Sequence, residues 1–182
     1  MSAVVRSSAT CFGKIRSRGD FVKGPGHHQL ISVLDRWVSQ GMERLSEDPR
    51  WKAAYDNACA VDFAFIGARS RLSVVGHLRP STDASGRRFP FLTASTIERD
   101  DALMFRCAPV GLVHSFASLA RVTEAGVQGG EVADLLANLD DIDCAADFDA
   151  ALRSDPLGHF VRRNTPESLA GMVGAPGTDA VR

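Results

Sequence analysis

Cysteine is scarce in this sequence, and its few copies are far apart. The 182 residues hold four cysteines, Cys11, Cys59, Cys107 and Cys144, with no Cys-x-x-Cys pair and no histidine close enough in sequence for a zinc knuckle. The spacing excludes the usual zinc signatures. Since free cysteine behaves as a small apolar core residue, we predict buried, unpaired thiols.

Long apolar runs and an excess of positive charge are also missing. The formal net charge is −1, so no global positive field exists to hold nucleic acid or an anionic membrane surface. The opening residues MSAVVRSSATCFG contain no sustained apolar run, which argues against a secretory signal or a membrane span. We therefore expect a cytoplasmic chain with no nucleic-acid partner and no membrane insertion.

Common signatures of catalysis and of cofactor binding are absent. Gly13-Lys14 lacks the upstream glycine of a phosphate-binding loop, and Ile15 replaces the hydroxyl residue that would hold magnesium. No Gly-x-Gly-x-x-Gly, Gly-x-Ser-x-Gly or His-Glu-x-x-His occurs. The aspartates of residues 140–149 lack the glycine and glutamate of a calcium loop, and more simply cap a helix near Asp143. We expect no catalytic residues, no cofactor and no metal.

What is present is the composition of an ordinary globular protein. Apolar residues make up 45% and charged residues 24% of the chain. A chain of this length can bury one substantial core. We predict a single domain over residues 1–172, followed by a flexible tail at 173–182, where the residues are small and polar.

Hydrophobic periodicity predicts an α/β fold of the α+β type. Apolar residues at helical spacing predict a helix over residues 30–45, and Asp48 before Pro49 predicts the start of a second, short helix. Strands are expected at residues 10–15, 61–66, 71–78 and 89–97, with a hairpin turn at 67–70. One apolar stripe covers residues 110–120 and another covers 132–139. We therefore expect a central antiparallel sheet flanked by helices, with a helical C-terminal half.

A polar loop at residues 79–90 lies between two of the predicted strands. Its Pro, Ser, Asp and Gly residues are turn formers, and two arginines follow them, which suits a surface that displays side chains to a partner. The alternative is that Ser81 and Asp83 fold the loop internally while Arg87 or Arg88 pairs with a carboxylate.

Three segments then form a pattern in a fixed order. They are CFGKIRSRGDFV (residues 11–22), LDRWVSQGM (34–42) and VVGHLRPSTDASGRRFPF (74–91). They contain a Gly-Lys followed by Gly-Asp-Phe, an Asp-x-Trp, and a Gly-x-Leu-x-Pro-Ser-x-Asp-x-x-Gly-Arg-x-Phe-Pro. With this pattern the chain resembles the TagF (ImpM) family of type VI secretion-associated proteins, although Arg16 stands where that family commonly has proline.

The resemblance implies a regulator and not an enzyme. It predicts a post-translational repressor of type VI secretion that binds a cytoplasmic forkhead-associated scaffold protein, in a pathway that includes threonine phosphorylation. A structural or accessory part of the secretion apparatus is the first alternative. A small hydrolase or phosphatase subunit is the second, and it would require titratable groups that converge in one cleft.

The family motif also suggests which residues contact the partner. Trp37 and Phe89 are expected to fill the core, and Gly19 and Gly86 to permit turns. The remaining polar motif residues are expected to be exposed, and they form the predicted partner-binding set: Lys14, Asp20, Ser81, Asp83 and Arg87. Ion pairs hidden among these residues would explain the same pattern.

Overall fold

The computed structural model describes residues 9–25, 27–67, 72–99 and 101–154. The described strands are β1 (Ala9–Gly13), β2 (Val22–Lys23), β3 (Val61–Ile66), β4 (Leu72–Arg79) and β5 (Phe91–Glu98). The described helices are α1 (His28–Ser46), α2 (Trp51–Asp56), α3 (Asp101–Gly111), α4 (Val113–Val127), α5 (Val132–Asp140) and α6 (Cys144–Ser154). The predicted tail at 173–182, the end of the domain at 172 and most of the 67–70 turn lie outside the described residues.

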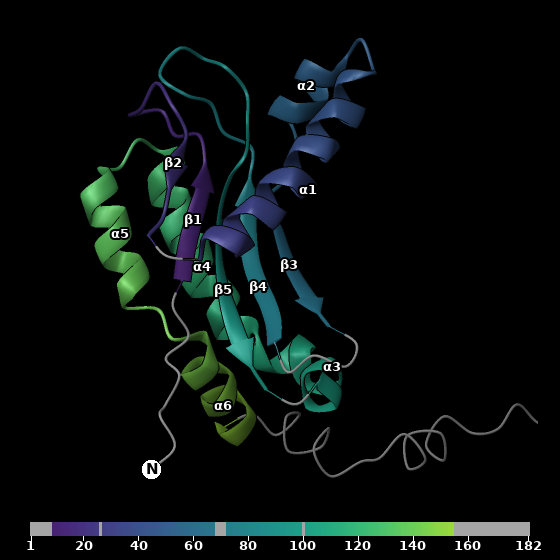
Figure 1. The fold of residues 1–182 in the computed structure, drawn as a ribbon, viewed down its shortest axis with the longest axis vertical. Helices are drawn as coiled ribbons and strands as arrows, with labels where there is room; N and C mark the ends of the chain where they lie inside the picture. The colour runs from purple at the N-terminus through teal and green to yellow at the C-terminus, as the bar shows by residue number, and fades with distance from the viewer. Residues whose placement is uncertain (1–8, 26, 68–71, 100, 155–182) are drawn as a thin grey trace, which may run out of the picture.

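The strands form one antiparallel sheet in the order β2-β1-β5-β4-β3 (Figure 1). Consecutive strands β3, β4 and β5 build a meander, and β1 then pairs with β5, placing Phe12 opposite Leu92. β3 and β2 are thus the two edges of the described sheet. The predicted α+β fold with its antiparallel sheet is confirmed.

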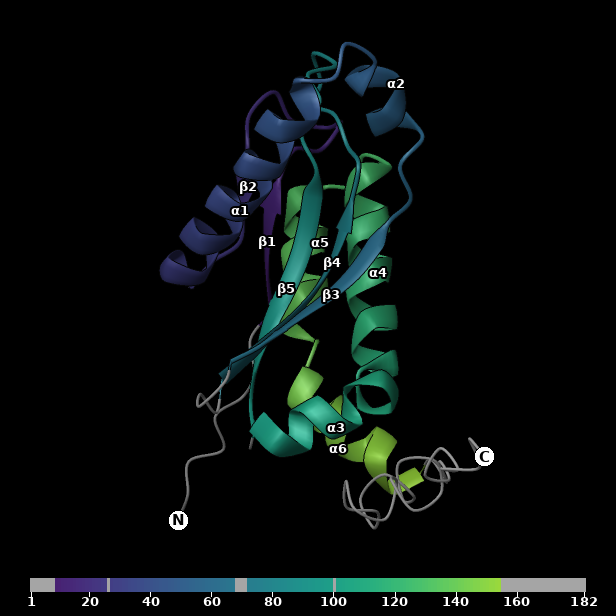
Figure 2. The same cartoon turned by 90° about the vertical axis from the view of Figure 1, so that its right-hand side faces the viewer.

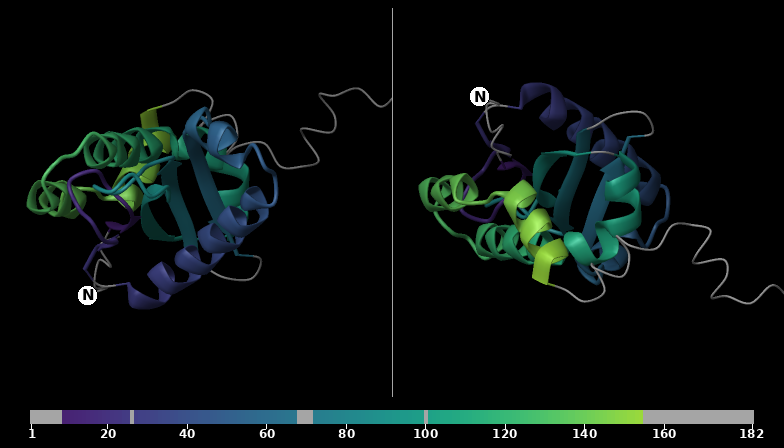
Figure 3. Two further views of the ribbon diagram at one scale, coloured as in Figure 1. Left: turned by 90° about the horizontal axis from the view of Figure 1, so that it is seen from above. Right: turned by 90° about the horizontal axis from the view of Figure 1, so that it is seen from below.

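Helices cover both faces of the sheet. α1 lies alone across one face, while α4 and α5 cover the other and α3 and α6 close one end (Figures 2 and 3). Side chains alternate between the faces along a strand, so Phe91 joins the core under α4 to α6 and its neighbour Leu92 joins the core under α1. Because both faces of β5 are covered, both residues are buried, at 0% and 1% exposure.

The last described helix completes the larger core. Asp143 Oδ1 accepts hydrogen bonds from the amides of Ala145 and Ala146, both at 3.1 Å, which confirms the predicted helix cap. Phe148 and Leu152 on α6 are then fully buried. Helix α6 is therefore part of the domain's core.

Some predicted boundaries were wrong for local reasons. The single stripe predicted at 110–120 is shared by two helices, since α3 ends at Gly111 and α4 begins at Val113. Helix α2 begins at Trp51, later than predicted, because the Asp48 carboxylate accepts a hydrogen bond from the Arg50 amide in a preceding turn. No single described helix is long and apolar enough to cross a membrane; α3 and α4, bent by 63°, pass that test only as a pair.

The cysteines follow the prediction with one exception. Cys11, Cys107 and Cys144 are buried, whereas Cys59 is exposed after α2. Burial raises the pKa of Cys11 to about 12 and that of Cys144 to about 11. Both buried thiols therefore stay protonated at neutral pH and act as apolar core groups.

Candidate functional site

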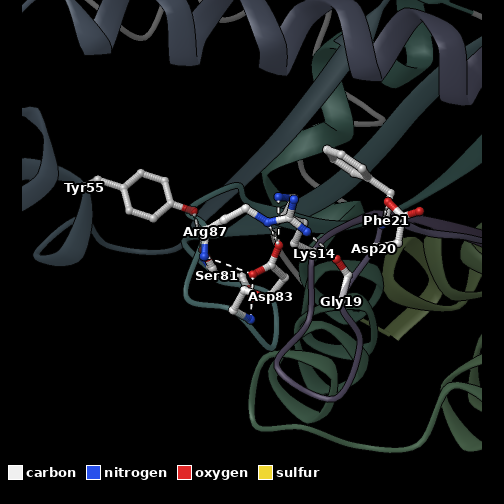
Figure 4. Close-up of polar contacts among 9 residues, drawn as sticks. Lys14, Gly19, Asp20, Phe21, Tyr55, Ser81, Asp83 and Arg87 are labelled. Atoms are coloured by element: carbon white, nitrogen blue, oxygen red, sulfur yellow. Dashed lines mark hydrogen bonds and ion pairs between the residues drawn. The ribbon is translucent and has the colours of Figure 1, made fainter.

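Two loops that are distant in sequence meet at one end of the sheet. Residues 14–21 follow β1, and residues 80–90 connect β4 to β5 (Figure 4). The Ala84 amide donates to the Arg18 carbonyl at 2.9 Å, and the Lys14 amide donates to the Pro90 carbonyl at 3.4 Å. The pairing of β1 with β5 places the loops side by side and so brings the first and third motif segments together.

Asp83 is the centre of the contact between the loops. Its Oδ2 accepts from Lys14 Nζ at 2.9 Å and from Arg87 Nε at 2.6 Å. Its Oδ1 accepts from the amides of Ser85 and Arg87, each at 2.9 Å. Arg87 Nη2 also donates to the Gly19 carbonyl in the other loop. The Asp83 carboxylate thus closes the turn of its own loop and pairs with Lys14, which follows β1.

These contacts keep Asp83 ionised. Burial by itself would raise the pKa of this carboxyl group, but the hydrogen bonds from Lys14, Arg87 and the Ser85 amide outweigh it and hold the pKa well below its usual range. The site therefore contains a permanent negative charge between two cations at neutral pH.

A second set of contacts anchors the 80–90 loop to α2. The Tyr55 hydroxyl donates to the Ser81 carbonyl at 2.9 Å and accepts from the Ser81 amide at 2.8 Å. Burial raises the pKa of Tyr55 to about 12, so the hydroxyl stays protonated and can donate. Arg88 pairs with both carboxylate oxygens of Asp56, at 2.8 and 2.7 Å. The alternative prediction is confirmed for Asp83 and for the two paired arginines, whereas Ser81 holds the loop through its backbone and its hydroxyl has no hydrogen-bond partner among the described residues.

Three of the five predicted contact residues are not at the surface. Lys14 is 8% exposed, Ser81 5% and Asp83 2%, so the expectation that they are exposed was wrong. Mutual pairing compensates the charges of Lys14 and Asp83 and lets them be buried, which their residue types alone do not indicate. Asp20 and Arg87 are exposed. That these residues contact a partner stays a prediction.

The glycines of the two loops behave differently. Gly86 has φ 76°, which confirms the predicted turn, whereas Gly19 lies in a bend of the chain with φ outside the left-handed region. Gly13 has φ 131°, and a Cβ there would lie 2.0 Å from the Pro90 carbonyl oxygen. Gly13 therefore allows the two loops to approach closely.

Aromatic side chains surround this end of the sheet. Phe12, Phe21 and Phe89 form one cluster, with Phe12 and Phe21 stacked at 5.5 Å and Phe89 edge-on to both. Phe89 is half-buried against the core under α1, close to the expectation for it. Phe21 is 39% exposed, and the centroid of its ring lies 5.1 Å from Lys14 Nζ, which is placed over the ring.

Trp37 was expected in the core and is instead 41% exposed. Its ring packs against Phe63 at 5.2 Å and Phe65 at 5.1 Å, at the edge strand β3. Beside it is a mostly apolar groove of about 340 Å³ between α1, α2, β3 and the 80–90 loop, lined by Trp37, Val38, Gly41, Met42, Leu45, Tyr55, Ala58, Cys59, Val61, Leu78, Pro80 and Pro90.

Sequence reasoning missed this surface, because the edge position of β3 and the exposure of its side chains are known only from the fold. Val61 and Phe65 are exposed residues of β3 with large apolar side chains, and β3 is an edge strand. An edge strand with exposed apolar residues marks an interaction surface or a site of aggregation. We call the surface formed by Trp37, Val61 and Phe65, with the adjoining groove, the Trp37 surface.

The two loops hold paired charges and not a cluster of metal ligands. No group of three or more His, Cys, Asp or Glu side chains among the described residues is placed to hold a metal ion. The ionisable groups that meet at the two loops are committed to each other through hydrogen bonds at 2.6 to 2.9 Å. What the arrangement can do is fix two loops and present the aromatic side chains beside them.

Known proteins resemble this chain in fold and in sequence. The chain is similar to the crystal structure of PA0076 from Pseudomonas aeruginosa PAO1, with a TM-score of 0.58 and 18% identity over 79% of this chain and 78% of that one. That likeness shows a shared fold. Residues 10–142 match the model of the TagF N-terminal domain, type VI secretion system-associated, and the chain belongs to this family. No curated protein matches it.

Proposed function

We propose that this protein is a non-catalytic repressor of type VI secretion that acts in the cytoplasm by binding a forkhead-associated scaffold protein. Membership of the type VI secretion-associated family supports the pathway. The Trp37 surface is the observation that carries the mode of action. It exposes large aromatic and aliphatic side chains next to a preformed groove, and such residues dominate the binding energy of protein interfaces.

The motif tryptophan supports this proposal more strongly than a core residue would. Trp37 lies on the middle of α1 and is held by Phe63 and Phe65 without being covered by them. A ring with restricted freedom loses little entropy when a partner buries the rest of it. Hydrogen bonds between the Tyr55 hydroxyl and the Ser81 backbone hold the 80–90 loop, which supplies Pro80 and Pro90 to the groove.

The test is capture of the scaffold together with secretion output in the same cells. A tagged copy in a host with an active type VI system should co-purify the scaffold and lower secretion. Trp37→Ala should lose both effects while the protein still folds. Phe105→Ala is the matched control, because Phe105 is an exposed aromatic, 74% exposed, on α3, and its loss should change neither readout.

The outcomes separate the proposal from its alternatives. If the Trp37→Ala variant still captures the scaffold, the Trp37 surface is not the binding surface. A chain that co-fractionates in fixed stoichiometry with assembled secretion particles, without lowering secretion, would be a structural component and would refute the repressor role.

A further inference from the structure

We propose that residues 16–23, with Val132 on α5, form a second binding site, which takes an acidic segment of the partner protein that carries an apolar side chain. We call it the loop site. The inference deepens the proposed function and depends on it for the identity of the partner. The chemistry that the loop site recognises does not depend on the proposed function.

The loop site is a hollow with an apolar floor. It has a volume of about 530 Å³ and is lined by Arg18, Gly19, Asp20, Phe21, Val22, Lys23 and Val132. Val22 is buried, Val132 is half-buried, and Phe21 is exposed at its side. An apolar side chain of a ligand can therefore leave water here, while its neighbours stay at the charged rim.

The charges around the hollow sum to a positive value. Arg18 and Lys23 line the hollow and are exposed, and exposed Arg16 is two residues before Arg18 in sequence; none of the three forms an ion pair within the described part of the chain. Two exposed carboxylates belong to the same region: Asp20, which lines the hollow and accepts a hydrogen bond from the Phe21 amide at 2.8 Å, and Glu131, which precedes the lining residue Val132.

The group formed by Lys14, Asp83 and Arg87 adds to this positive charge. Lys14 and Arg87 share the single carboxylate of Asp83, so the group of three retains one positive charge. The Arg87 side chain is 62% exposed and its guanidinium reaches the Gly19 carbonyl on the wall of the hollow. A ligand that complements this rim is acidic.

The loop is already held in place. Arg87 Nη2 donates to the Gly19 carbonyl, the Ala84 amide donates to the Arg18 carbonyl, and Ser17 Oγ donates to the Gly130 carbonyl at 3.1 Å. These contacts tie the loop to the 80–90 loop on one side and to the turn before α5 on the other. Binding therefore costs little ordering of the chain.

The chemistry favours a peptide over a nucleic acid. A site for single strands needs a continuous basic groove and several aromatic platforms. Here the exposed cations are interspersed with the carboxylates of Asp20 and Glu131, the exposed aromatic at the hollow is Phe21, and the whole chain carries a net charge of −1. An apolar hollow with a short basic rim fits an acidic peptide.

The experiment is an NMR titration of the full chain, labelled with nitrogen-15, with a synthetic peptide of alternating glutamate pairs and single leucines. Amide shifts should concentrate at residues 16–23 and 130–133. Raising the salt from about 50 mM to about 500 mM should weaken binding, because exposed charges are screened. The analogue with glutamine in place of glutamate should bind at least about tenfold more weakly.

Variants make the test specific. The double reversal Arg18→Glu with Lys23→Glu should raise the peptide Kd about tenfold or more, while Arg18→Lys should keep binding. Arg36→Glu with Arg44→Glu, on exposed positions of α1, is the matched control and should leave the Kd unchanged. Melting temperatures of all variants should stay close to the parent's, because these side chains are exposed.

Contrary outcomes are equally definite. Equal binding of the glutamine analogue, shifts centred elsewhere, or tighter binding of a single-stranded oligonucleotide at the same residues would overturn the proposal. If the double reversal captures the scaffold as well as the parent does, the loop site fails and the proposed function stands. If the parent captures no scaffold but binds the peptide as described, the proposed function fails and the loop site stands.

Discussion

At the scale of single residues, Asp83 is the clearest case of a charge that pairing keeps inside the fold. A buried carboxylate is costly unless cations and hydrogen-bond donors surround it. Asp83 has two cationic partners and two backbone amides. Its neighbours lower its pKa, so its ionised form is favoured in the folded protein.

Asp83→Asn should therefore lower stability in a pH-dependent way. The folded pKa lies below the unfolded value of about 3.9, so this group's contribution is complete above that value and is lost as the pH falls below it. Urea denaturation from pH 7 down to pH 3 should show the variant less stable at neutral pH, with the gap narrowing below about pH 4. A gap that is constant with pH would mean that the charge of Asp83 contributes nothing.

Trp37 and Phe148 should respond very differently to truncation. Phe148 is fully buried, so Phe148→Ala should cost about 3 to 5 kcal/mol of unfolding free energy. Trp37 is partly exposed, so Trp37→Ala should cost only about 1 to 2 kcal/mol. Denaturation at pH 7 measures both. Equal losses would contradict the exposed position of Trp37 and the surface built on it.

At the scale of elements, the turns decide how the two loops meet. Gly86 has φ 76° with open space around it, so Gly86→Ala should cost about 1 kcal/mol for the backbone conformation alone. Gly13→Ala adds a clash with the Pro90 carbonyl oxygen at 2.0 Å, so its cost should be several times larger. Thermal unfolding of the two variants compares them, and similar melting temperatures would show that the loops can separate freely.

Helix α6 tests where the folded domain ends. The family match ends at residue 142, yet Phe148 and Leu152 of α6 are fully buried in the larger core. A chain truncated after residue 142 should therefore lose cooperative unfolding and expose apolar surface to a fluorescent dye. A truncated chain that melts like the parent would show that α6 contributes little to the core.

Element type could be predicted from the sequence where one physical signal was strong. Helix α1 and strands β3 to β5 follow from apolar periodicity, and the cap at Asp143 follows from its residue type. The break between α3 and α4 was missed because the apolar stripe continues across it, although Pro109 and Gly111, two helix-disfavouring residues, stand directly before it. The start of α2 depended on whether Asp48 capped the helix or the turn before it.

At the scale of the whole molecule, the candidate site could be predicted only in part. The motif placed Lys14, Asp83 and Arg87 in one site, and the structure brings them together. Their burial depends on β1 pairing with β5, a contact between distant segments that residue type does not reveal. The exposure of Trp37 likewise depends on α1 covering its face of the sheet alone (Figure 3).

The two proposed binding surfaces lie next to the same loop. The Trp37 surface and the loop site both adjoin the 80–90 loop, which supplies Pro80 and Pro90 to one and the Arg87 contact to the other. A partner that reaches both would combine an apolar anchor with charge complementarity, which together give affinity and specificity.

The most direct test of the central claim is calorimetric titration of the purified chain into the purified forkhead-associated scaffold. The account predicts saturable binding with a Kd in the micromolar range or tighter, about −8 kcal/mol or more favourable. It also predicts that Trp37→Ala weakens binding while Phe105→Ala does not. No detectable heat at high concentrations, with both proteins folded, would contradict the claim that this protein represses secretion by capturing the scaffold.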